Sequence, residues 1–283
     1  MRSWRHVITG VRQVRASECS VTHVLHTYRY GPDKPVQVLA IHGLTGHGRR
    51  WEKLATAHLP DVSILAPDLI GHGRSSWAAP WTIEANVAAL ADVLDAEASG
   101  PVLVAGHSFG GAVALTLAAT RPDLVAGLVL LDPAVALDGG WMRDIADAML
   151  SSPDYPDRDE ARADKLSGSW GEVAAADPAE LERELDEHLI TLPNGRLGWR
   201  ISVPATMSYW SELTRPIALP ANVIPVTLIR ATRTSPPYVS AELIGALQAA
   251  LGDRFVLTDL DCDHMVSQAL PAETAAIIRG QLG

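Results

Sequence analysis

The stretch that most constrains the fold is Val102 to Gly111, which reads VLVAGHSFGG. Its first four residues are apolar, as in a buried strand, and an alanine- and leucine-rich helical stretch at 112–119 follows its last glycine. Between them lies a G-x-S-x-G motif, in which Gly106 and Gly110 have no side chains to keep the turn open. We therefore predict a strand, a sharp turn and a helix, with Ser108 projecting its hydroxyl where a base can reach it.

Strands and helical stretches alternate on both sides of this turn. Further apolar runs predict strands at 36–41, 62–66, 124–131, 223–230 and 254–260. This alternation predicts an α/β protein with a doubly wound, mainly parallel sheet, flanked by helices on both faces. Alternating apolar and polar residues at 11–15 and 21–30 predict an antiparallel hairpin at the edge of the sheet.

The alternation stops between residues 134 and 220, where no strand-like run appears. Tryptophan and methionine occur there among helical, charged segments. We predict a helical insertion at 134–220 and a core domain made of 1–133 and 221–283. Trp141, Met207 and Trp210 are candidates for an apolar lid over the serine, and packing between helices is the alternative for each of them.

The composition argues against several classes of partner. Asp and Glu number 33 against 23 Lys and Arg, and the net charge of −10 is unsuited to nucleic acid or anionic lipid. The two cysteines are too few for a disulfide framework, and no apolar run reaches the ~18 residues of a membrane span. Nucleotide and zinc motifs are absent, so we expect no cofactor and no metal. These features predict a cytoplasmic protein with a small-molecule substrate. The oligomeric state, a homodimer included, stays open.

Four loops together resemble those of the α/β-hydrolase fold family. They are His42-Gly43, the D-x-x-G-H-G-x-S loop at 68–75, the elbow at 106–111 and the late Asp263-His264-Met265. The resemblance implies an eight-stranded sheet with a helical cap inserted after the sixth strand. In the family the catalytic residues follow the order nucleophile, acid, histidine, so the resemblance assigns Ser108 as the nucleophile and His264 as its base.

The resemblance also assigns groups around the reacting atoms. It places the backbone N–H groups of Leu44 and Phe109 in the oxyanion hole, where they would stabilise the negative charge that develops during attack on a carbonyl. It places His42 and His107 where family members shape the loops or line the pocket. Met265, next to the late histidine, is a further candidate for the substrate pocket.

The acid departs from the family's commonest pattern. After the seventh core strand a glycine and an aspartate usually follow, but residues 231–237 contain no carboxylate. Asp132, which ends the preceding strand, is a position that some members use instead, and there it would share the rim with the serine. The alternative is that Asp132 only caps the next turn. Asp261 and Asp263 are weaker candidates, because adjacency to His264 does not aim a carboxylate at its ring.

These assignments predict a serine hydrolase with a Ser-His-Asp triad and an acyl-enzyme intermediate. The bond would be an ester, a thioester, a lactone or a carbon–carbon bond beside a ketone, in a small and mainly apolar substrate. Three alternatives keep the fold: a cofactor-independent oxygenase, lyase or cyclase that uses the His-Asp pair as base, a cofactor-free haloperoxidase-like perhydrolase, and a non-enzymatic ligand receptor.

Overall fold

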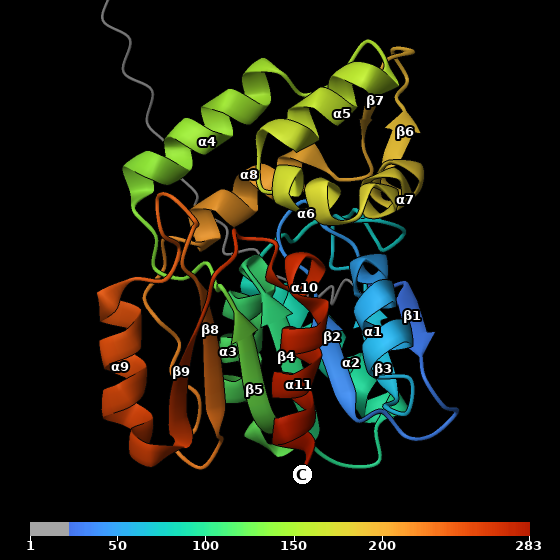
Figure 1. The fold of residues 1–283 in the computed structure, drawn as a ribbon. Helices are drawn as coiled ribbons and strands as arrows, with labels where there is room; N and C mark the ends of the chain where they lie inside the picture. Colours follow the sequence, from blue (N-terminus) through green and yellow to red (C-terminus); the bar gives the residue numbers. More distant parts are fainter. Residues whose placement is uncertain (1–22) are drawn as a thin grey trace, which may run out of the picture.

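A seven-stranded sheet forms the centre of the computed structural model, which describes residues 23–283 (Figure 1). In spatial order its strands are β1 (Thr27–Tyr30), β3 (Ile64–Pro67), β2 (Val38–Ile41), β4 (Val102–His107), β5 (Val125–Leu131), β8 (Val226–Ala231) and β9 (Phe255–Leu260). β1 pairs antiparallel with β3, and the pairs from β3 to β9 are parallel. The predicted α/β fold with a mainly parallel sheet is confirmed.

Seven of the eight expected strands fall within residues 23–283, and the structure forms a seven-stranded sheet there. Of the predicted edge hairpin, 11–15 and the first residues of 21–30 lie outside the described residues, and the part within them forms β1. The side chains of β1 alternate between exposed and half-buried positions, as expected for an edge strand with one solvated face. The inserted segment follows β5, the fifth strand within residues 23–283.

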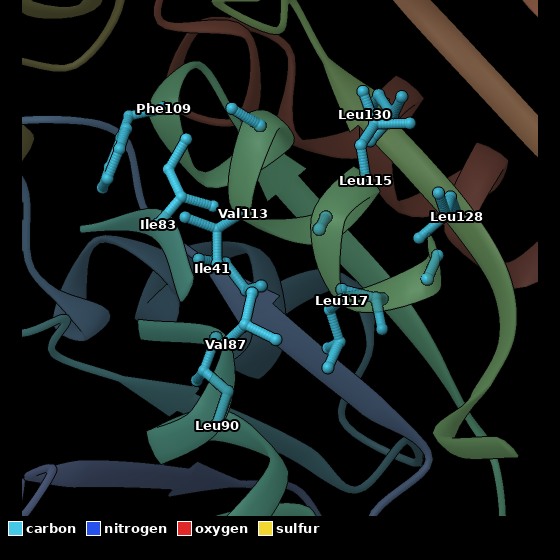
Figure 2. Close-up of a cluster of buried hydrophobic side chains, with 14 of the residues drawn as sticks. Ile41, Ile83, Val87, Leu90, Phe109, Val113, Leu115, Leu117, Leu128 and Leu130 are labelled. Carbon is cyan, nitrogen blue, oxygen red and sulfur yellow. The ribbon is translucent and has the colours of Figure 1, made fainter. Parts of the chain in front are cut away.

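Helices cover both faces of the sheet, because successive residues of a strand point to opposite faces. In β2, Leu39 and Ile41 belong to one apolar cluster, and Val38 and Ala40 belong to another. Figure 2 shows Ile41 in the first cluster, among side chains of two helices that cover this face. The first cluster includes residues of α2 (Ile83–Glu97), α3 (Phe109–Thr120) and α9 (Ala241–Leu251), and the second includes residues of α1 (Glu52–His58) and α11 (Pro271–Leu282).

Short helical turns complete the core. They are η1 (Gly48–Trp51), η2 (Pro122–Leu124), η3 (Gly252–Arg254) and α10 (Val266–Ala269).

The segment between β5 and β8 lies over one end of the sheet, as Figure 1 shows. It contains α4 (Gly139–Ser151), α5 (Arg158–Ser167), α6 (Trp170–Ala176), α7 (Pro178–His188), β6 (Leu189–Thr191), β7 (Leu197–Trp199) and α8 (Val203–Glu212). The prediction that this segment contains no strands is wrong, because β6 and β7 form an antiparallel hairpin. Each strand has only three residues, too few for a visible alternation, although Asn194-Gly195 between them is a turn signal.

Two buried carboxylates of α7 hold this segment against the core. Glu184 accepts hydrogen bonds from both Nε and Nη2 of Arg50, with the Nε bond at 3.0 Å. Glu187 pairs with Arg49 at 3.0 Å and also with Arg74. These contacts join a helix of the inserted segment to η1, which follows β2, and to the loop that follows β3.

Within residues 23–283, no helix is long and apolar enough to cross a membrane.

Candidate active site

Ser108 occupies the turn between β4 and α3 with a backbone that few non-glycine residues adopt. Its φ is 53° and its ψ is −119°, and such strain is common at catalytic nucleophiles. A Cβ atom on Gly106 would lie 2.5 Å from the carbonyl oxygen of Gly110, and one on Gly110 would lie 2.5 Å from that of Ile41. Both glycines are therefore required by close backbone approach, as the motif predicts.

Asp132 and His264 lie 132 residues apart in the chain and form a direct pair. Asp132 Oδ2 accepts a hydrogen bond from His264 Nδ1 at 2.6 Å. The carboxylate is buried, with 1% of its side chain exposed. Its other contacts come from the end of β8 and the loop after it: the Ala231 N–H donates to Oδ1 at 3.2 Å and the Thr234 hydroxyl donates to Oδ2 at 3.3 Å. The segment that usually carries the acid in the family thus orients an acid that directly follows β5.

The two other candidate acids point elsewhere. Asp263 accepts a hydrogen bond from the backbone N–H of His264 at 2.7 Å, not from its ring. Asp261 is 88% exposed and pairs with Arg233.

Aromatic rings hold the His264 imidazole in place. Tyr238 stacks on it, with ring centroids 4.1 Å apart and planes inclined by 23°. The His107 ring lies 4.7 Å away, and its Nε2–H donates to the carbonyl oxygen of His264 at 2.7 Å. Burial and the neighbouring His264 keep the pKa of His107 well below its usual range, so it serves as a neutral donor. Tyr238 was not predicted, although an aromatic residue in the loop after β8 was an available signal.

Two other buried histidines fix the loop that contains Leu44. His42 Nδ1–H donates to the Gly43 carbonyl at 2.7 Å, and its Nε2 accepts the Leu69 N–H. His72 Nε2 accepts the Thr45 N–H at 3.3 Å. Burial lowers the pKa of both imidazoles, to about 4 for His72, which keeps them neutral and able to accept. His42 shapes this loop and does not line the pocket.

Ser108, His264 and Leu44 line one cavity of about 460 Å³. A Cβ atom on Gly43 would lie 3.0 Å from the Ser108 Cβ, so the Leu44 loop passes close to the serine. Of the predicted pocket residues, His107, Trp210 and Met265 line this cavity. Met207 does not line it, and Trp141 lines a neighbouring groove beside Tyr238, so both predictions are corrected. Trp170 and Trp199, which belong to the tryptophans of the predicted helical insertion, also line the cavity. Cavity residues that the sequence analysis missed include Arg50, Tyr155 and Lys165.

Residues 38–277 match the model of the alpha/beta hydrolase family. The chain belongs to the α/β-hydrolase family. This α/β hydrolase is 62% identical over 259 residues to "Lipase LipV" of Mycobacterium tuberculosis, a match that covers 92% of this chain and 98% of the relative. It is 39% identical over 106 residues to "Esterase Rv0045c" of the same organism, covering 37% of this chain and 35% of the relative.

Solved structures share the fold of this α/β hydrolase. The crystal structure of an E-2-(acetamidomethylene)succinate hydrolase aligns with a TM-score of 0.74 at 20% identity, covering 91% of this chain and 94% of the other. The M. tuberculosis esterase Rv0045c aligns with a TM-score of 0.65 at 23% identity, covering 92% of each chain. At such identities the likeness concerns the fold alone.

Within residues 23–283, no group of three or more acidic, histidine or cysteine side chains is placed to hold a metal ion.

Proposed function

We propose that this α/β hydrolase cleaves a carboxylic ester of a small molecule through Ser108, His264 and Asp132. The observation that carries the proposal is the pair between Asp132 and His264, whose imidazole lines the same cavity as the strained Ser108. The names of the two relatives, a lipase and an esterase, favour an ester over a thioester, a lactone or a carbon–carbon bond.

The pair sets the direction of proton transfer. Because His264 Nδ1–H donates to Asp132, Nε2 is the nitrogen left to accept the Ser108 proton. The serine oxygen then attacks the ester carbonyl, and the N–H groups of Leu44 and Phe109 stabilise the oxyanion. Imidazolium Nε2–H protonates the departing alcohol, which leaves an acyl-enzyme, and water attacks the acyl-enzyme by the same route.

In one alternative mechanism the His264-Asp132 pair acts as the base, but Ser108 is not a nucleophile. In a base-catalysed oxygenase, lyase or cyclase, His264 would take its proton from the substrate, and Ser108 would only donate a hydrogen bond. A fluorophosphonate probe separates the two mechanisms, because it bonds covalently to an activated serine. We expect wild-type protein to carry the probe mass on the peptide containing Ser108, and Ser108→Ala protein to carry none. Unlabelled wild-type protein with intact fold would contradict an activated serine.

We further propose that residues 134–220 form a cap that sets the length of the acyl chain. Trp210 on α8 lines the cavity, whereas Met207, one turn earlier on the same helix, does not. Trp210→Ala should therefore shift the preference among p-nitrophenyl esters toward longer chains, because it enlarges the apolar space. Met207→Ala is the matched control and should keep the preference. Equal profiles for both variants in a chain-length series of kcat/KM would contradict this role of Trp210.

A further inference from the structure

The cavity wall contains two buried cations that the proposed mechanism does not use. Arg50 and Lys165 line the cavity that contains Ser108, and their side chains are 6% and 9% exposed. A buried cation is costly unless a carboxylate compensates its charge. The acids around these cations therefore determine what the wall can bind.

A single carboxylate serves both cations. Glu184 Oε1 accepts hydrogen bonds from Lys165 Nζ at 2.6 Å and from Arg50 Nη2 at 2.5 Å. His47 also forms a hydrogen bond with Glu184, but burial lowers the pKa of His47, so its imidazole is not counted as a further positive charge. Around Glu184, two positive charges thus meet one negative charge.

The other acids of the site supply little of the missing negative charge, and Asp164 acts on Lys165 more weakly than Glu184 does. Asp164 lines the cavity but is exposed to solvent, and its Oδ2 accepts a hydrogen bond from the Tyr155 hydroxyl at 2.6 Å. Water screens an exposed charge far more than a buried one. Asp132 does not line the cavity and is bound to His264. One positive charge inside the wall therefore has no buried carboxylate of its own among the described residues that line the cavity.

Lys165 has the capacity to bind a further group. Its Nζ lies 4.4 Å from the ring centroid of Trp199 and 5.1 Å from that of Trp170. Aromatic faces attract the cation but are weak hydrogen-bond acceptors, and an ammonium has three N–H donors, of which Glu184 accepts one. Burial lowers the pKa of Lys165 to about 8 despite Glu184, consistent with incomplete compensation.

We propose that the substrate carries a carboxylate away from its scissile ester, and that Lys165, supported by Arg50, binds this carboxylate. The inference rests on the proposed ester hydrolysis and makes its substrate class narrower. The cavity would select monoesters of short dicarboxylic acids, or esters of alcohols that carry a carboxylate, over neutral esters of equal length. The substrate would then be anionic at one end, and not mainly apolar as the sequence predicts.

Two pairs of esters test this selectivity on both sides of the scissile bond. In the first pair, mono-p-nitrophenyl adipate carries the carboxylate in its acyl part, and p-nitrophenyl hexanoate is the neutral counterpart. In the second pair, 4-carboxyphenyl hexanoate carries it in the alcohol part, and phenyl hexanoate is the neutral counterpart. For each pair the ratio of kcat/KM is measured in wild type, Lys165→Met, Lys165→Arg and Lys53→Met. Lys53 is a matched control, because it pairs with Asp177 of the inserted segment at 2.8 Å but does not line the cavity.

In one of the two pairs, Lys165→Met should lower the ratio by about ten- to hundredfold, the worth of a charge-assisted hydrogen bond. Lys165→Arg should keep most of the ratio, and Lys53→Met all of it. Adipate should inhibit wild-type turnover more strongly than the neutral adipamide, a comparison that needs no variant to fold. The proposal would be overturned by two results together. The kcat/KM ratio of charged to neutral ester would be the same in Lys165→Met as in wild type for both pairs, and adipate and adipamide would inhibit equally.

Failure of the proposed ester hydrolysis would give results different from failure of the proposed carboxylate site. No ester would then be turned over, or Ser108→Ala would retain turnover. Calorimetric binding of adipate against adipamide to wild type and Lys165→Met would still decide whether the cavity binds a carboxylate. Equal affinities in that experiment would reject the carboxylate site.

Discussion

Replacing Ser108 with alanine is expected to lower ester turnover by on the order of 10⁴-fold or more, while the protein remains folded. The serine provides the nucleophile, so its loss abolishes the acyl-enzyme route and leaves only the contribution of the oxyanion hole and of binding. Its side chain is small and faces a cavity, so its removal disturbs little packing. Steady-state kinetics with a p-nitrophenyl ester, together with a thermal melting curve of each protein, measure both parts of the expectation.

His264→Ala is the companion variant, because a nucleophile and its base act as one unit and their losses should be about equal. In base-catalysed chemistry Ser108→Ala would lose only a hydrogen bond, which lowers the rate roughly tenfold. The rate loss in His264→Ala would remain severe, because the base would be missing. A rapidly quenched wild-type reaction gives an independent result, since a peptide containing Ser108 should carry the acyl mass. A mild defect in Ser108→Ala without any adduct would favour the base-catalysed mechanism.

The elbow could be predicted because contiguous residues determine it. The apolar strand, the glycines that permit close backbone approach and the helix all lie between Val102 and Ala119. The meeting of Asp132 and His264 followed from topology, since both lie after parallel strands whose carboxyl ends share a rim. The Ala231 N–H and the Thr234 hydroxyl orient the Asp132 carboxylate. Their positions depend on how the chain folds at and after the end of β8, and no sequence pattern predicts them.

The chemistry of the cavity wall was not predictable in the same way. Lysine and arginine are exposed in most proteins, and the burial of Lys165 and Arg50 depends on Glu184, which is distant from Arg50 in the chain. Met207 and Trp210 are one turn apart on α8, so only the rotation of that helix against the core decides which one lines the cavity. Pairings between remote residues and helix rotations are tertiary properties, and a periodic pattern does not contain them.

The Asp132 carboxylate matters because a neutral imidazole has two tautomers. As an acceptor it requires the proton on His264 Nδ1, which leaves Nε2 free to accept the serine proton. An amide in its place can offer its NH₂ group to Nδ1 and so stabilise the opposite tautomer, in which Nε2 already carries the proton. Asparagine has nearly the shape of aspartate, so the exchange isolates this electronic effect.

Asp132→Asn is accordingly expected to lower kcat by about 10⁴-fold at neutral pH with little change in melting temperature. Asp263→Asn is the matched control, since that carboxylate accepts from the backbone N–H of His264 and not from its ring, and it should change kcat by less than about tenfold. Initial rates at saturating ester with both variants decide the matter. A severe loss in Asp263→Asn beside a mild one in Asp132→Asn would move the acid to the loop after β9, and the contact at 2.6 Å between Asp132 and His264 would then be a structural pair only.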